Sequence, residues 1–71
     1  MKGDIEMNKS YKFVRDIIKS AEDSIIITIT SQHNLLLAYG HWYNDSVIDY
    51  ESRLILSQWQ DADRGVWHVI I

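Results

Sequence analysis

The residues best suited to chemistry in this chain are concentrated in the twelve-residue segment 40–51. Trp and Tyr are common anchors of protein interfaces because they give a large contact area at low entropic cost. Carboxylates beside them would suit a basic partner or a cationic ligand. The alternative is that these rings only complete a small core. The segment holds one histidine, three aromatic rings and three carboxylates: His41, Trp42, Tyr43, Asp45, Asp49, Tyr50 and Glu51.

A catalytic interpretation of segment 40–51 would use His41 as a general base, oriented by Asp45 or Asp49. No nucleophile motif accompanies these residues, because the sequence contains no Gly-x-Ser-x-Gly. A chain of 71 residues also has little material with which to build a water-excluding cleft. We therefore expect a protein that is not an enzyme and has no catalytic residues.

The histidines and the second acidic loop give no convincing metal site. His33, His41 and His68 are too far apart in sequence to share a helix face or one strand. Asp61-Ala62-Asp63-Arg64-Gly65 is similar to the start of a calcium-binding loop, but its glycine comes one residue too early. We expect a solvated hairpin turn there, and neither a metal nor another cofactor.

Charge is distributed unevenly along the chain, whose net charge is −3. Residues 1–23 are balanced, whereas residues 24–71 contain only Arg53 and Arg64 as cations. The basic surface typical of nucleic-acid-binding domains is missing, so direct nucleic-acid binding is not expected. An acidic surface could instead occupy a basic groove that normally binds phosphates. Its carboxylates would be Asp45, Asp49, Glu51, Asp61 and Asp63.

Length and composition indicate one small domain over residues 1–71 with a thin core. The absence of cysteine excludes disulfides and cysteine-based zinc sites, so a second copy could complete the core, and we expect a homo-oligomer. The uncharged stretch 24–44 has polar residues at its middle, at 31–34, which argues against a membrane span. No signal peptide is recognisable, and we expect a cytoplasmic protein.

The first part of the chain has the periodicity of an amphipathic helix. Tyr11, Val14, Ile18 and Ala21 recur at helical spacing and predict a helix over residues 8–22. Asn8 or Ser10 could serve as its N-cap. Residues 1–6 are expected to be a loose leader or, alternatively, a short first strand.

The rest of the chain predicts strands. Residues 24–31 alternate, with Ile25, Ile27 and Ile29 on the core face, and 31–34 form a turn. A second, central strand follows from Leu35 until Gly40, where an isolated glycine indicates a bulge, a bend or a close approach of another backbone.

Further strands are predicted over 53–59 and 66–71, joined by a hairpin turn. Trp59 and Trp67 are expected to face each other across this hairpin. The segment 47–51 is ambiguous between a helical turn and an edge strand. The fold class is therefore α+β, with one N-terminal helix packed on a three- to four-stranded antiparallel sheet, a meander of hairpins.

These features favour a small non-enzymatic protein that binds or inhibits another protein. Its size and acidity are typical of accessory proteins encoded by phages and mobile elements. One alternative is a small-ligand-binding protein in which the rings of segment 40–51 line a pocket, and another is a purely structural homo-oligomer. The expected partner-binding residues are His41, Trp42, Tyr43, Asp45, Asp49, Tyr50, Glu51, Asp61 and Asp63.

Overall fold

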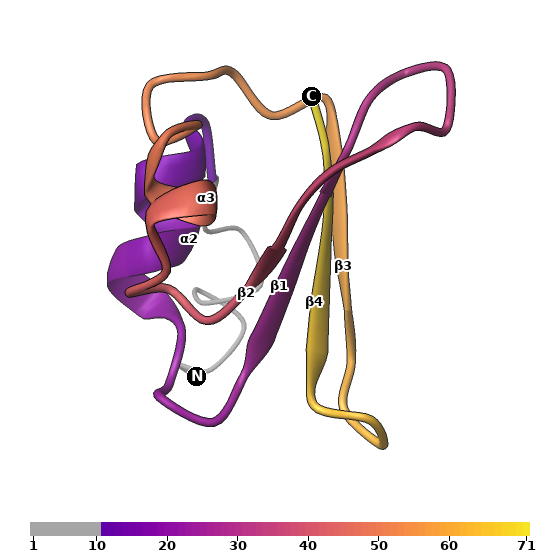
Figure 1. Cartoon of the computed structure of the whole chain (residues 1–71). Coiled ribbons are helices and arrows are strands. Elements are labelled where there is room, and N and C mark those ends of the chain that lie inside the picture. Colours follow the sequence, from indigo (N-terminus) through magenta and orange to yellow (C-terminus); the bar gives the residue numbers. More distant parts are fainter. Residues whose placement is uncertain (1–10) are drawn as a thin grey trace, which may run out of the picture.

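Residues 11–71 fold into two layers, a sheet with two short helices on one side of it (Figure 1). The computed structural model describes residues 11–71, so the predicted leader and the N-cap candidates Asn8 and Ser10 lie outside the described residues. The elements in chain order are α2 (Val14–Ser20), β1 (Ile26–Thr30), β2 (Leu36–Gly40), α3 (Asp45–Ile48), β3 (Ser57–Asp61) and β4 (Val66–Ile70).

The sheet is mixed, and the prediction of an antiparallel meander is wrong. Its four strands have the order β2-β1-β4-β3, and the central pair β1–β4 is parallel. The two outer pairs are antiparallel hairpins. The chain leaves β2 through α3 and returns so that β4, rather than β3, lies beside β1. For this reason β2, predicted to be central, is an edge strand.

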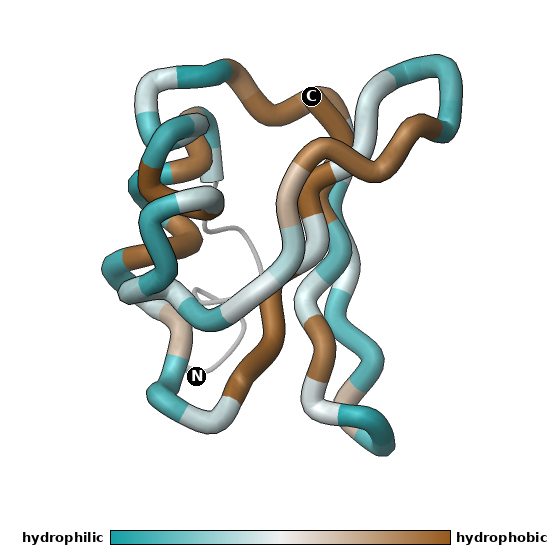
Figure 2. The backbone as a smooth tube through the Cα atoms, viewed as in Figure 1, coloured by the Kyte–Doolittle hydropathy of each residue, from teal (hydrophilic) through white to brown (hydrophobic). Residues whose placement is uncertain are grey.

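The core lies between the helices and the inner face of the sheet. Both hairpin turns are hydrophilic, whereas the tubes of β1 and of the facing helices carry hydrophobic residues (Figure 2). No helix in the described part of the chain has the length and apolar character needed to cross a membrane. The buried hydrophobic residues come from both helices, from β1, β2 and β4, and from the position after β4: Val14, Ile17, Ile27, Ile29, Ala38, Val47, Trp67, Val69 and Ile71.

Helix α2 is shorter than the predicted helix over residues 8–22. The carboxylate of Asp16 accepts hydrogen bonds from the backbone N–H groups of Phe13 (2.9 Å) and Lys12 (3.1 Å). These bonds fix the N-terminal end, and Phe13 is extended and bridges to Leu54. At the other end the backbone of Ala21 is extended again. Tertiary pairing at Phe13 therefore overrides the helical periodicity before Val14.

The pattern of strand β1 is confirmed. Ile27 and Ile29 are fully buried, while Thr28 and Thr30 on the opposite face are half-buried. The following turn contains Asn34 with a φ of 67°, a left-handed conformation that asparagine tolerates. Alternation and turn chemistry are local properties, which explains why the sequence predicted this hairpin.

The second hairpin differs from its prediction in position and register. Strand β3 begins at Ser57 instead of residue 53. Trp59 pairs with His68, and Trp67 pairs with Gln60, so the two tryptophans lie on opposite faces of the sheet. The expected Trp59–Trp67 contact is therefore wrong. Trp67 is buried in the core and Trp59 is 50% exposed.

Candidate functional site

Segment 40–51 forms the end of β2, a tight turn and helix α3. Gly40 has a φ of +154°, and a Cβ at this position would lie 2.6 Å from Asn44 Oδ1. The same oxygen accepts a hydrogen bond from the backbone N–H of His41 at 2.6 Å. The close approach at Gly40 is therefore made by the side chain of Asn44, whereas the sequence suggested another backbone. The turn brings the aromatic residues beside the first turn of α3.

Three consecutive rings form an ordered cluster in this turn. The rings of His41 and Tyr43 are stacked, with centroids 5.1 Å apart and planes 1° from parallel. Trp42 meets Tyr43 edge-on at 5.3 Å. Tyr43 is 51% exposed, whereas Trp42 is half-buried and packs against the core. Two neighbouring rings therefore hold an exposed tyrosine in one orientation.

The other residues of segment 40–51 divide between surface and core. Asp45, Asp49 and Glu51 are exposed, and Tyr50 is half-buried against the core. Val47, the buried residue of α3, fixes this helix on the sheet. Within residues 11–71 no ion pair involves these three carboxylates. The segment therefore presents unneutralised negative charge beside Tyr43.

The remaining two predicted partner-binding residues lie elsewhere. Asp61 ends β3 and Asp63 lies in the β3–β4 turn, at the end of the sheet remote from α3 (Figure 1). The carboxylate of Asp61 is 3.9 Å from Arg64 Nε. The structure therefore brings together the residues of segment 40–51 but not Asp61 or Asp63.

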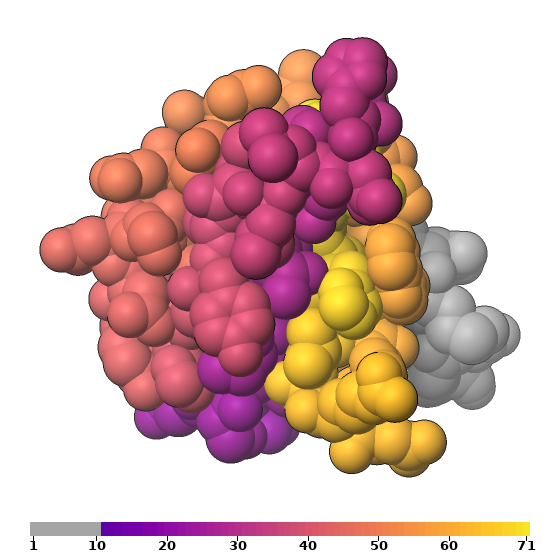
Figure 3. Space-filling view, turned by 45° about the vertical axis from the view of Figure 1, so that its right-hand side comes forward, coloured from indigo at the N-terminus to yellow at the C-terminus, as the bar shows by residue number. Residues whose placement is uncertain are grey.

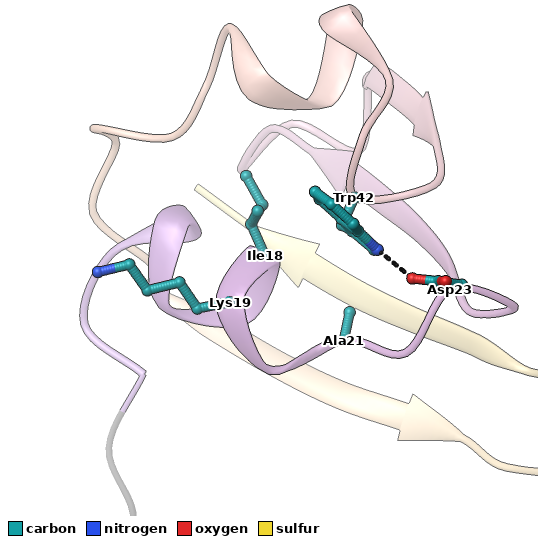
Figure 4. A pocket seen from close by; sticks show the side chains of 5 residues that line it. All are labelled: Ile18, Lys19, Ala21, Asp23 and Trp42. Carbon is teal, nitrogen blue, oxygen red and sulfur yellow. Dashed lines mark hydrogen bonds between the residues drawn. The ribbon is translucent and has the colours of Figure 1, made fainter.

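A small open pocket lies beside Trp42. It has a volume of about 250 Å³ and is lined by α2 residues and the loop after this helix. The indole N–H of Trp42 donates a 2.8 Å hydrogen bond to Asp23 Oδ1, and the Lys19 side chain extends away from the indole (Figure 4). Tyr43 and Tyr50 do not line the pocket. Of the three rings predicted to line a ligand pocket, only Trp42 lines this one.

The outer face of the sheet carries an aromatic row that sequence reasoning missed. The pairing registers of the four strands place one residue from each strand side by side across the sheet, in the order Tyr39, Thr28, His68 and Trp59 on β2, β1, β4 and β3. His68 stacks on Trp59 with centroids 4.9 Å apart, and its Nδ1 is 3.0 Å from Thr28 Oγ1. Strand alternation placed single residues on this face. The row itself depends on the parallel pairing of β1 with β4, which has no local signal.

Neither a metal-binding arrangement nor similarity to known proteins identifies a function for these surfaces. In residues 11–71 no three His, Asp or Glu side chains are grouped closely enough to hold a metal ion. No protein-family model, curated protein or solved structure matches the chain. Segment 40–51 and the outer face of the sheet are therefore the two candidate functional surfaces.

Proposed function

We propose that this chain is a non-enzymatic protein-binding module and that segment 40–51 is its contact surface. The observation that carries the proposal is the fixed, half-exposed ring of Tyr43 between His41 and Trp42. A tyrosine held by its neighbours loses little side-chain entropy on binding, which is a property of interface anchors.

The surrounding charge selects the class of partner. Asp45, Asp49 and Glu51 are exposed next to this anchor. Such a combination suits a partner with a basic surface, and a groove that normally binds nucleic-acid phosphates has this character. Inhibition would then follow from occupation of the groove. Asp61 and Asp63 are too remote from Tyr43 to belong to the same small contact, so the proposal rests on segment 40–51 alone.

The test is a quantitative capture experiment with extracts of the native host, followed by titration of the retained protein. Tyr43→Ala is expected to weaken binding at least about tenfold, the effect of removing a hot-spot tyrosine. Leu35→Ala removes a side chain that is 63% exposed at the β1–β2 turn, outside segment 40–51, and should leave binding unchanged. Equal affinity of wild type and Tyr43→Ala would refute the proposal.

Salt dependence tests the acidic contribution separately. If the carboxylates of segment 40–51 face a basic groove, the dissociation constant should rise as salt screens the charges. The Asp45→Asn/Asp49→Asn variant should show a shallower dependence on salt than wild type. Salt-independent binding would remove the electrostatic part of the proposal.

A second candidate is a small-ligand-binding protein, which the pocket beside Trp42 favours. Its volume of about 250 Å³ is near the lower limit for small-molecule sites. Asp23, whose carboxylate binds the indole N–H, would select a cationic or amine ligand. Titration of cationic ligands against Trp fluorescence, with Trp42→Phe as the control for the signal, distinguishes this function.

A further inference from the structure

The outer face of the sheet is the largest feature that segment 40–51 does not explain. Both helices lie on the opposite face, and no other described element covers the outer one. Figure 3 shows β2, β1, β4 and β3 next to one another on this side of the molecule. Leu36 is 57% exposed and Tyr39 63% exposed.

This face is almost free of charge. The strand registers place eleven residues on it, and Asp61 at one corner is the only ionisable carboxylate, already near Arg64 of its own chain. The other members are apolar, hydroxyl-bearing or aromatic: Ile26, Thr28, Thr30, Leu36, Tyr39, Ser57, Trp59, Val66, His68 and Ile70.

The lack of charge decides which occupant fits. A stacking platform for nucleic acid needs cations for the phosphates, and the face contains no lysine or arginine. In a two-fold dimer the same surface of both copies forms the interface. A strongly charged surface would therefore repel the equivalent surface of the second copy, whereas this nearly uncharged face would not. Asp45, Asp49 and Glu51 are on α3 and the following turn, on the helix side, where they would remain in solvent.

Internal pairing lowers the cost of burying the polar atoms of the face. Thr28 Oγ1 and His68 Nδ1 already form a hydrogen bond within one chain, and the His68 ring is covered on one side by Trp59. Covering this pair with a second copy would not leave Thr28 Oγ1 without a partner. This hydrogen bond is therefore retained when the face is covered.

The size of the face matches a reversible dimer. Four strands of five residues give a face of roughly 19 Å by 17 Å at ordinary strand spacing. Two copies would bury on the order of 1,000 Å² of accessible surface, the lower limit for specific association. We propose that the outer sheet face is a two-fold homodimer interface, in which the row Tyr39–Thr28–His68–Trp59 packs against the same row of a second copy.

An interface near the lower size limit for specific association is expected to be reversible. Sedimentation equilibrium of the full chain over a wide concentration range measures the dissociation constant. Tyr39→Glu places two like charges in the apolar contact and is expected to raise this constant at least about tenfold. Tyr43→Glu changes a second exposed tyrosine, which lies in the turn between β2 and α3, and should leave the constant unchanged.

Circular dichroism confirms that both variants remain folded before they are compared, and Trp59→Glu provides a second variant on the face. Weaker association of Tyr39→Glu and Trp59→Glu with normal association of Tyr43→Glu supports the proposal. A chain that stays monomeric at every concentration overturns it. A dimer that resists both substitutions on the face, or that only Tyr43→Glu dissociates, overturns it as well, because another surface then forms the contact.

Discussion

Thr28 and His68 lie opposite each other on the two central strands, with Thr28 Oγ1 3.0 Å from His68 Nδ1. The pair joins residues that are 40 positions apart in the sequence. It therefore links the two hairpins across the parallel ladder on the face that has no helix.

Replacement of Thr28 by valine tests this link. Thr28→Val keeps the shape and the β-branching but removes the hydrogen bond, so the free energy of unfolding should fall by about 1 kcal/mol. Thr30→Val is the matched control, because Thr30 lies on the same face of β1 and no hydrogen bond of its side chain occurs within residues 11–71. Urea denaturation measures both, and equal stability of the two variants would show that the bond contributes nothing.

The two glycines with positive φ should respond differently to alanine. Gly40→Ala combines a φ of +154° with a Cβ 2.6 Å from Asn44 Oδ1, and should cost at least about 2 kcal/mol. Gly65 has a φ of +65°, and no atom lies within 4 Å of the Cβ that alanine would add. Gly65→Ala should therefore lower the free energy of unfolding by about 1 kcal/mol, because only the left-handed backbone conformation is unfavourable. Thermal unfolding measures both variants. A lower melting temperature for Gly65→Ala than for Gly40→Ala would contradict the steric conflict between Gly40 and Asn44.

The start of α2 depends on one carboxylate. Asp16→Ala removes the acceptor of the Phe13 and Lys12 backbone N–H groups and should destabilise the protein by about 1 kcal/mol. Asp49→Ala at the end of α3 removes an exposed carboxylate and should change the stability by less than about 0.5 kcal/mol. Chemical denaturation of both variants is the measurement, and a neutral Asp16→Ala would refute the capping role.

The indole bond between Trp42 and Asp23 should hold the loop after α2 against the turn after β2. Trp42→Phe keeps an aromatic ring but loses the 2.8 Å hydrogen bond, so the free energy of unfolding should fall by about 1 kcal/mol or more. Asp23→Asn retains an acceptor and should cost less. Amide hydrogen exchange of residues 21–25 should rise in Trp42→Phe, and unchanged exchange there would show that the bond does not hold the loop.

Local patterns predicted the parts of the fold that depend on neighbours in sequence. Ile27 and Ile29 alternate with threonines, so the core face of β1 followed from spacing alone. The two predicted turns contain Asn34 and Gly65, residue types that tolerate the left-handed conformation found there. Tyr43 and the acidic side chains beside it were chosen as candidates because their residue types cluster in one short segment, and their role in binding remains a prediction.

Features that depend on distant pairing could not be predicted. Leu54 and Leu56 suggested a strand from residue 53, but the edge strand β3 has the polar sequence Ser57–Asp61 and is held mainly by its backbone ladder with β4. Periodicity likewise extended the first helix back past Phe13, which instead bridges to Leu54. The parallel pairing of β1 with β4 follows from the path of the chain through α3, and this pairing creates the aromatic row.

The parallel ladder between β1 and β4 also makes the molecule divisible in one defined way. A cut in the connection between α3 and β3 would separate a fragment with both helices and the β1–β2 hairpin from the β3–β4 hairpin, and the two would meet along this seam and in the core. Each fragment would hold only part of the core; the second is a lone hairpin, which is marginally stable in water, and the first loses the β4 side of its core. The fragments should therefore stay unfolded apart and reassemble when mixed, so that this small fold could report on the meeting of two proteins fused to its halves.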